Sequence, residues 1–194
     1  FARAILNKET GLIPKGGRRL VSQCGIFEYE GRFIMITDAA INIAPDVETQ
    51  IGIVENALPV ARALGVECPK VAVLSAVENV TDKMPSTVTA REIAERGVEG
   101  CVISGPLALD GAISMESVKH KAIKDPVAGQ ADILLVPFIE IGNVLYKACS
   151  YIAGKTMAST ICGASCPVII TSRADTPDSK YYSILMAVLR CLKA

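Results

Sequence analysis

The sequence predicts a layered α/β protein, and three observations support this fold class. Strand-like and helix-like segments alternate along the chain, an order typical of parallel strands joined by crossover helices. Hydrophobic residues make up 51% of the 194 residues, which is enough for a large core and excludes a disordered chain. Aromatic residues contribute only 5%, and this scarcity disfavours an all-β sandwich.

The first elements follow from local spacing and turn residues. Apolar residues at helical spacing predict a helix over residues 1–8, and the Pro- and Gly-containing stretch 11–19 predicts a loop. Two apolar strands are predicted over 20–29 and 32–38, and residues 30–31 (Glu-Gly) between them are typical of a hairpin turn.

A long helix is predicted next, over residues 47–64. Asp46 fits its N-cap and Gly65 its end, whereas Pro59 inside it predicts a kink or a break. Beyond it, strands are predicted over 71–75, 100–104, 133–136, 158–162 and 168–171, and helices over 89–96, 115–121, 143–151 and 176–192.

Charge and targeting signals exclude several classes of protein. The chain carries 20 basic and 20 acidic side chains, so no general basic field attracts nucleic acid or an anionic membrane. Its longest apolar runs have strand length, far below the ~20 residues that span a bilayer, and no signal peptide is visible. The seven Cys residues lack zinc-site spacing, which predicts reduced thiols, no metal and a cytoplasmic protein.

The residues that follow each strand are the candidates for a site, because open α/β sheets bind ligands at the carboxyl ends of their strands. Thr171-Ser172-Arg173 precedes the last predicted helix, where a hydroxyl, a guanidinium and free N–H groups can hold a phosphate. Asp175 and Asp178 follow within one turn and can act as acid or base groups. Spacing alone favours ordinary helix capping for the same residues.

Three further features carry less chemistry. Gly142-Asn143 is interpreted as a turn before a helix, and His120 as a solvated residue rather than a general base. Gly16-Gly17 lacks the surroundings of a nucleotide-binding loop.

Several unusual strings occur in order along the chain. They are ITDAAINIAP (36–45), VLSAVE (73–78), MPST (84–87), GPLALD (105–110), PVAGQAD (126–132), GNVLYK (142–147) and TSRAD (171–175). Together they resemble the phosphate acetyl/butyryl transferase family, most closely its phosphate butyryltransferase branch, and the resemblance covers essentially the whole chain.

The resemblance implies two three-layer α/β/α domains with a cleft between them, similar to the isocitrate/isopropylmalate dehydrogenase architecture. By the family pattern, residues 1–49 and 165–194 belong to the first domain, and residues 50–164 form an inserted second domain. Family members carry a further segment before the position of Phe1, so we expect the first domain to be N-terminally incomplete here.

The resemblance also implies the reaction acyl-CoA + phosphate ⇌ acyl phosphate + CoA, with butyryl or another short acyl group, as in butyrate metabolism. CoA is then a substrate, no cofactor stays bound, and the protein is a homo-oligomer. No activated nucleophile is evident, so we expect direct attack in a ternary complex. The implied catalytic residues are Ser172, Arg173, Asp175 and Asp178, and the implied substrate-binding residues are Arg3, Asp38, Gly142, Asn143 and Lys147.

Two departures from the family pattern leave alternatives open. Ser179 stands where the acetyl branch has its catalytic Asp, so the base is either Asp175 or Asp178. Phe138 replaces an acidic residue before the Gly-Asn pair. A non-catalytic fragment or an acyl-CoA-binding regulatory domain is therefore the second hypothesis. A dehydrogenase with a nicotinamide cofactor and a divalent metal is the third, which the missing nucleotide motif and acidic cluster disfavour.

Overall fold

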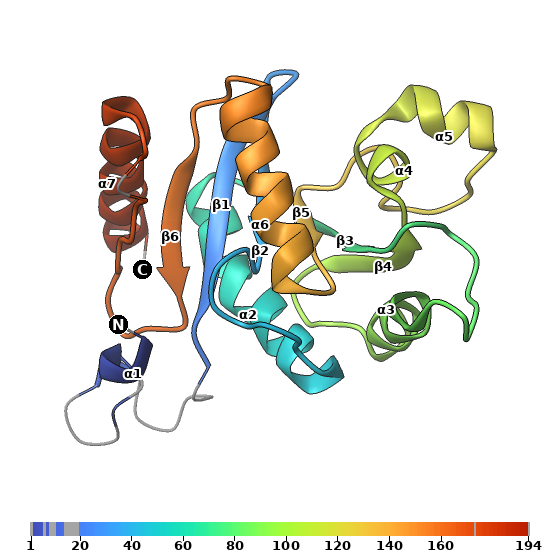
Figure 1. The fold of residues 1–194 in the computed structure, drawn as a ribbon, viewed down its shortest axis with the longest axis horizontal. Coiled ribbons are helices and arrows are strands. Elements are labelled where there is room, and N and C mark those ends of the chain that lie inside the picture. The colour runs from blue at the N-terminus through green and yellow to red at the C-terminus, as the bar shows by residue number, and fades with distance from the viewer. Residues whose placement is uncertain (1, 6, 8–10, 14–19, 173, 194) are drawn as a thin grey trace.

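One mixed sheet organises the part of the chain that the structure describes. The computed structural model describes residues 2–5, 7, 11–13, 20–172 and 174–193 (Figure 1). The strands are β1 (Ser22–Tyr29), β2 (Arg32–Thr37), β3 (Lys70–Leu74), β4 (Val102–Leu107), β5 (Ile133–Leu135) and β6 (Ala158–Cys162). They pair in the order β4-β3-β5-β2-β1-β6.

Helices connect these strands and cover the sheet. They are α1 (Ala2–Ile5), α2 (Val47–Ala63), α3 (Pro85–Arg96), α4 (Leu109–Ile113), α5 (Met115–Lys121), α6 (Ile139–Lys147), the π-helical turn η1 (Ala148–Ile152) and α7 (Pro177–Leu192). Within the described residues, no helix is long and apolar enough to cross a membrane. Most of the predicted loop 11–19 lies outside the described residues.

The strand directions agree with the predicted parallel pairing for four strands and with the predicted hairpin for the first two. β2, β5, β3 and β4 are parallel to one another, whereas β1 runs antiparallel to both β2 and β6. The reason is the hairpin, which is confirmed. Glu30 and Gly31 both have positive φ angles, of 50° and 78°, and so short a turn returns the chain antiparallel.

The sheet separates two hydrophobic cores. Alternate residues of each central strand face opposite sides, so Met35 belongs to one core, and its neighbours Ile34 and Ile36 belong to the other. Residues of α2, α3 and α7 complete the first core, and residues of α4 and α6 pack against the second. Figure 1 shows α2 and α6 on opposite faces of the sheet, which gives three layers.

Helix α2 has the predicted cap but not the predicted break. The Asp46 carboxylate accepts the Thr49 N–H at 2.8 Å, and the helix ends just before Gly65, whose φ is +90°. Pro59 lies within a helix that continues to Ala63. Its apolar neighbours on both sides are buried in the core, and this packing offsets the hydrogen bond that Pro cannot make.

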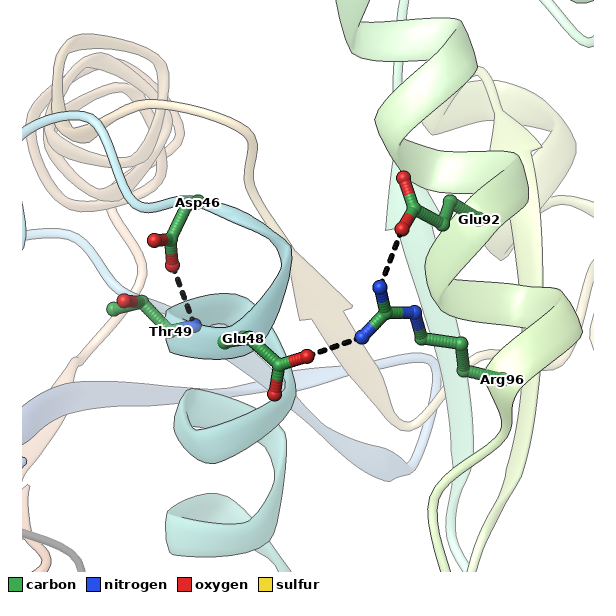
Figure 2. A network of polar contacts seen from close by, with 5 residues as sticks. All are labelled: Asp46, Glu48, Thr49, Glu92 and Arg96. Atoms are coloured by element: carbon green, nitrogen blue, oxygen red, sulfur yellow. Dashed lines mark hydrogen bonds and ion pairs between the residues drawn. The ribbon is translucent and has the colours of Figure 1, made fainter.

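An exposed ion pair links α3 to the start of α2. The Arg96 guanidinium contacts Glu92 one turn earlier in α3 at 2.6 Å and also Glu48 in the first turn of α2 (Figure 2). Because all three side chains are substantially exposed, water and salt screen these contacts. The buried core therefore holds these helices together far more than the ion pairs do.

Helix α7 covers the open edge of β6 with hydroxyl groups. The Ser183 Oγ accepts the Ser159 N–H at 2.9 Å, and the Ser179 Oγ accepts the Met157 N–H at 3.3 Å. Near the other end of the helix, Arg190 donates to the Ile161 carbonyl at 3.1 Å. Edge strands expose unpaired N–H and C=O groups, so these contacts close an edge that could otherwise pair with another chain.

The predicted strand 168–171 is wrong. Only Val168 pairs with the sheet, through a single bridge to Ile161. The preceding Pro167 has no N–H to extend the ladder, and the chain then leaves the sheet toward α7. Residues 170–172 are therefore available to a site rather than fixed within the sheet.

We expect Ser183→Ala to lower the free energy of unfolding by about 1–3 kcal/mol, because it leaves the buried Ser159 N–H without an acceptor. Urea denaturation followed by circular dichroism measures this change. Glu92→Ala is the control, since loss of one exposed ion pair should change stability by less than about 1 kcal/mol. Equal effects of the two substitutions would contradict this account of the β6 edge.

Candidate active site

A cavity of about 350 Å³ lies where α6 faces β1, β6 and the segment before α7. Asn143, Lys147, Ser172 and Asp175, all predicted as site residues, line it. Larger cavities of about 520 and 680 Å³ lie against α7 and beside the end of α2, but no predicted site residue that the structure describes lines either of them. The smaller cavity is therefore the candidate site.

Asp38 folds the loop that forms one wall of this cavity. Its carboxylate accepts the N–H groups of Ala40 at 2.9 Å, of Ile41 at 3.1 Å and of Asn42 at 3.1 Å. The Asn42 side-chain amide donates a further bond at 2.6 Å. Asp38 itself is buried and does not line the cavity, whereas Ala40 and Ile41 do. Asp38 thus acts on the site through the loop that it organises.

Burial raises the pKa of Asp38 above its ordinary value, and the four hydrogen bonds to its carboxylate act in the opposite direction. A buried carboxylate is costly when it is charged, and here the surrounding N–H groups replace only part of its hydration. The charge state of Asp38 is therefore coupled to folding.

Helix α6 lies very close to that loop because Gly142 has no side chain. A Cβ at Gly142 would lie 2.7 Å from the Asp38 carbonyl oxygen and 2.9 Å from the Ala39 Cα. Beside it, the Asn143 amide donates to the Ala39 carbonyl at 3.3 Å. The predicted turn at Gly142-Asn143 is wrong, because α6 already begins at Ile139. The glycine is needed here for close packing and not for a turn.

A second glycine, Gly25, leaves space for the ring of Tyr146. A Cβ at Gly25 would lie within 2.6 Å of two ring carbons of Tyr146, so the ring covers this part of β1. Burial, followed by the nearby charge of Asp175, raises the pKa of Tyr146 well above its ordinary value. The phenol therefore stays protonated and can donate a hydrogen bond. Lys147 follows as an exposed cation at the cavity rim.

Ser172 and Asp175 form one compact turn. The Asp175 carboxylate accepts the Ser172 N–H at 2.6 Å, and the Asp175 N–H returns to the Ser172 carbonyl at 3.1 Å. The Ser172 hydroxyl oxygen accepts the Ala174 N–H at 3.3 Å. These bonds fix the carboxylate and the hydroxyl beside each other, and the carboxylate keeps further acceptor positions.

The two candidate bases occupy different places. Asp175 is partly buried in the cavity wall, whereas Asp178 is exposed in the first turn of α7 and does not line the cavity. Ser179, where the resemblance places the catalytic Asp of the acetyl branch, is buried and bonded to Met157 of the chain beside β6. Of the three, only Asp175 is placed to exchange a proton with a ligand in this cavity.

Two predicted arginines cannot be placed. Arg173 lies outside the described residues, and so does the side chain of Arg3. Arg3 belongs to α1, whose Ile5 packs in a small cluster with Ile161, and Ile41 packs against the same cluster. Because Ile41 and Ile161 also line the cavity, α1 lies next to the cavity wall.

Sequence reasoning missed several residues of the wall, among them Gln23 and Tyr146. Gln23 lies in β1 with 5% of its surface exposed, and its side-chain N–H donates to the Ser159 hydroxyl at 2.9 Å. A polar residue within a buried strand was the available signal for Gln23, and a glycine inside the same strand was the signal for a close neighbour such as Tyr146.

The described wall mixes apolar and polar side chains and is nearly neutral. It combines a cation, a carboxylate, hydroxyl groups and side-chain amides, but no Cys or His among the described residues. Within the same residues, no group of three or more His, Cys, Asp or Glu could hold a metal ion. His120 is exposed at the end of α5. Such a wall can bind a polar ligand and move one proton, through Asp175.

Comparison with known proteins gives consistent matches over nearly the whole chain. A sequence profile described as phosphate acetyl/butaryl transferase matches residues 3–188. The phosphate butyryltransferase of Clostridium acetobutylicum is 45% identical over 195 residues, covering 97% of this chain and 64% of that protein. The phosphate acetyltransferase of Thermotoga maritima is 44% identical over 162 residues, covering 81% of this chain and 55% of that protein.

A solved structure agrees with these matches. The branched-chain phosphotransacylase from Enterococcus faecalis V583 has a TM-score of 0.88 at 41% sequence identity, covering 95% of this chain and 67% of that chain. The present chain thus spans a little under two-thirds of the length of the curated butyryltransferase.

We expect the free energy of unfolding of the wild type, measured relative to Asp38→Asn, to fall as the pH rises from about 4 toward the raised pKa. The folded protein holds the Asp38 proton more tightly than the unfolded chain, so deprotonation favours unfolding. Urea titrations at a series of pH values measure this difference.

Asp46→Asn is the control, because its stability difference from the wild type should change with pH in the opposite direction. The Thr49 hydroxyl and N–H lower the pKa of Asp46, so the wild type should lose stability relative to this variant as the pH falls toward that lowered pKa. The free energy of unfolding of the wild type relative to Asp38→Asn should not stay constant or rise with pH. Either result would refute the role of burial at Asp38.

Proposed function

We propose, since this chain belongs to the phosphate acetyl/butaryl transferase family, that the whole protein transfers a short acyl group between CoA and phosphate. Butyryl is the expected acyl group, because the curated butyryltransferase is 45% identical. CoA and phosphate are then substrates, and no resident cofactor takes part.

One observation supports this proposal most directly. The cavity brings Ser172 and Asp175 of the segment before α7 together with Asn143 and Lys147 of α6. The reaction needs a hydrogen-bond donor to the reacting carbonyl, a group that exchanges the thiol proton, and positive charge for phosphate. These residues provide the first two, and Lys147 with the adjoining Arg173 would provide the third.

The mechanism that fits these groups is direct attack. In the direction that makes acyl-CoA, Asp175 takes the thiol proton, and the thiolate sulfur attacks the acyl phosphate carbonyl carbon. A C–S bond forms, the C–O bond to phosphate breaks, and phosphate leaves with the bonding electron pair. In the other direction, a phosphate oxygen attacks the thioester, and protonated Asp175 returns the proton to the departing sulfur.

Ser172 and the cations would assist this transfer through hydrogen bonds and charge, without forming or breaking covalent bonds of their own. The Ser172 hydroxyl would donate to the carbonyl oxygen, which becomes more negative at the transition state. In these roles Ser172 and Asp175 form no covalent intermediate, so both substrates would bind together in one complex. Much of the acceleration would then come from holding them in contact.

Several properties of the whole protein stay predictions. They include two three-layer α/β/α domains around a cleft, a homo-oligomeric state and a cytoplasmic location. The proposed domain bounds, 1–49 with 165–194 and 50–164, also stay untested. The described sheet nevertheless joins β1 and β2 from before residue 49 with the four strands after it.

We expect the whole protein to release CoA thiol from butyryl-CoA only when phosphate is present. A thiol-reactive dye follows the release, with sulfate in place of phosphate as the control for ionic strength. Thiol release at the same rate in both salts would indicate a thioesterase, and release in neither would refute the proposed transfer.

We expect Asp175→Asn to lower the rate of acyl-CoA formation by about 10²–10⁴-fold, since an amide cannot take the thiol proton. Asp178→Asn is the matched control, because this exposed side chain lies outside the cavity wall. Initial rates with butyryl phosphate and CoA measure both variants. A large loss in Asp178→Asn together with a normal rate in Asp175→Asn would transfer the base to Asp178.

A further inference from the structure

Tyr146 carries a hydroxyl that is accessible and that the described protein does not use. It forms no hydrogen bond with any residue that the structure describes. Among these residues, the unpaired side-chain atoms that are fully enclosed are the Oε1 atoms of Gln23 and Gln50, so the Tyr146 oxygen keeps accessible surface. Tyr146 itself is half-buried and lines the candidate active site. Its hydroxyl is therefore a donor that a ligand in the cavity can reach.

The ring that carries this hydroxyl is held in place on two sides. A Cβ at Gly25 would lie 2.5 Å from the Cδ2 of Tyr146 and 2.6 Å from its Cε2, so the ring fills the space that this glycine leaves on β1. Both Tyr146 and its neighbour Leu145 pack against the second hydrophobic core. Gly142 seats the same helix against the loop after β2. A donor on such a ring is positioned before any substrate arrives.

The charged neighbours of the phenol lie in the cavity wall. Burial is the main cause that raises the pKa of Tyr146, and the charges of Asp175 and Tyr151 raise it further. Asp175 and Tyr151 both line the cavity, so the accessible hydroxyl faces the same space as the Asp175 carboxylate. A phenol whose pKa lies above the ordinary value of about 10 keeps its proton at neutral pH and acts as a neutral donor.

The chemistry of the proposed substrates selects the acceptor for this donor. Phosphate is anionic, and the cations that suit it are Lys147 and the adjoining Arg173 rather than a phenol beside a carboxylate. The acyl carbonyl oxygen is neutral in the substrate and becomes negative in the transition state, where it can accept two hydrogen bonds. Asp175 does not oppose this charge, because it has taken the thiol proton by then.

Ser172 provides one of the two hydrogen bonds, and α6 can provide the other. The Ser172 hydroxyl oxygen accepts the Ala174 N–H at 3.3 Å, which leaves its own proton free for a substrate. Ser172 belongs to the segment before α7, whereas Tyr146 belongs to α6 across the cavity. The two hydroxyl groups thus lie on different walls and can contact one oxygen from two directions.

We propose that the Tyr146 hydroxyl is the second hydrogen-bond donor to the carbonyl oxygen of the transferred acyl group and is therefore a catalytic residue. The inference rests on the proposed function, because it takes the acyl group as the ligand of the cavity. The tyrosine keeps its proton and forms no covalent bond. Its hydrogen bond strengthens as the carbonyl oxygen becomes negative, so it should act on kcat more than on substrate affinity.

Tyr146→Phe in the whole protein keeps the ring and its packing but removes the hydroxyl. We expect kcat for thiol release from butyryl-CoA to fall about 100-fold, with the KM values for butyryl-CoA and phosphate changed less than about threefold. Tyr29→Phe is the matched control, because Tyr29 is also half-buried against the second core but lies outside the cavity wall. A normal kcat in Tyr146→Phe, equal losses in both variants, or an effect confined to the phosphate KM would overturn the inference.

Infrared spectroscopy of bound butyryl-CoA, labelled with ¹³C at the carbonyl and measured without phosphate, reports the hydrogen bonds to this oxygen. We expect binding to lower the carbonyl stretching frequency in the wild type and in Tyr29→Phe, and Tyr146→Phe to lose a large part of this shift. A purely structural role of the ring would leave the shift unchanged, and that result would overturn the inference.

The two measurements also separate this inference from the proposed function. A carbonyl shift that depends on Tyr146, in a protein without phosphate-dependent thiol release, would support the tyrosine as a carbonyl donor and refute the acyl transfer. Phosphate-dependent release with a normal kcat and an unchanged carbonyl shift in Tyr146→Phe would support the transfer and refute the role of Tyr146.

Discussion

The close approach of α6 to the loop after β2 is the constraint on which the candidate site depends. Gly142 permits it, since any Cβ would meet the Asp38 carbonyl oxygen and the Ala39 Cα. Once α6 is seated there, its next turn presents Asn143, Tyr146 and Lys147 to the cavity. The space left by this one glycine thus sets the position of three wall residues, because a packed helix moves as a unit.

A second constraint brings the opposite wall into place. Helix α7 is fixed to the edge of β6 by buried serine hydroxyls, and the chain before it must therefore cross the end of the sheet. That crossing places Ser172 and Asp175 opposite α6. Ser179, where the resemblance places the catalytic Asp of the acetyl branch, belongs to this attachment, whereas Asp175 lines the cavity.

Local signals in the sequence predicted much of the fold and part of the site. The Asp46 cap and the hairpin at residues 30–31 depend on neighbouring residues only, and both predictions are confirmed. The predicted strand 168–171 and the predicted turn at Gly142-Asn143 are wrong, because pairing partners and close approach depend on distant parts of the chain. Gln23 escaped notice for the same reason, since spacing does not show whether a buried amide finds a partner.

The chain has no net charge, whereas the substrates proposed for it are anionic. The charges within the cavity wall therefore matter more for binding than the total charge of the chain. Among the described wall residues, the charge of Lys147 is balanced by that of Asp175, so further cations for phosphate would have to come from Arg173 and from Arg3 on the adjoining α1. The described wall next to β1 carries no charged side chain, because Gln23, Ser159 and Ile161 lie there. Under the proposed function, a polar ligand would therefore meet its charged contacts on α6 and before α7, and its uncharged part would fit the side next to β1.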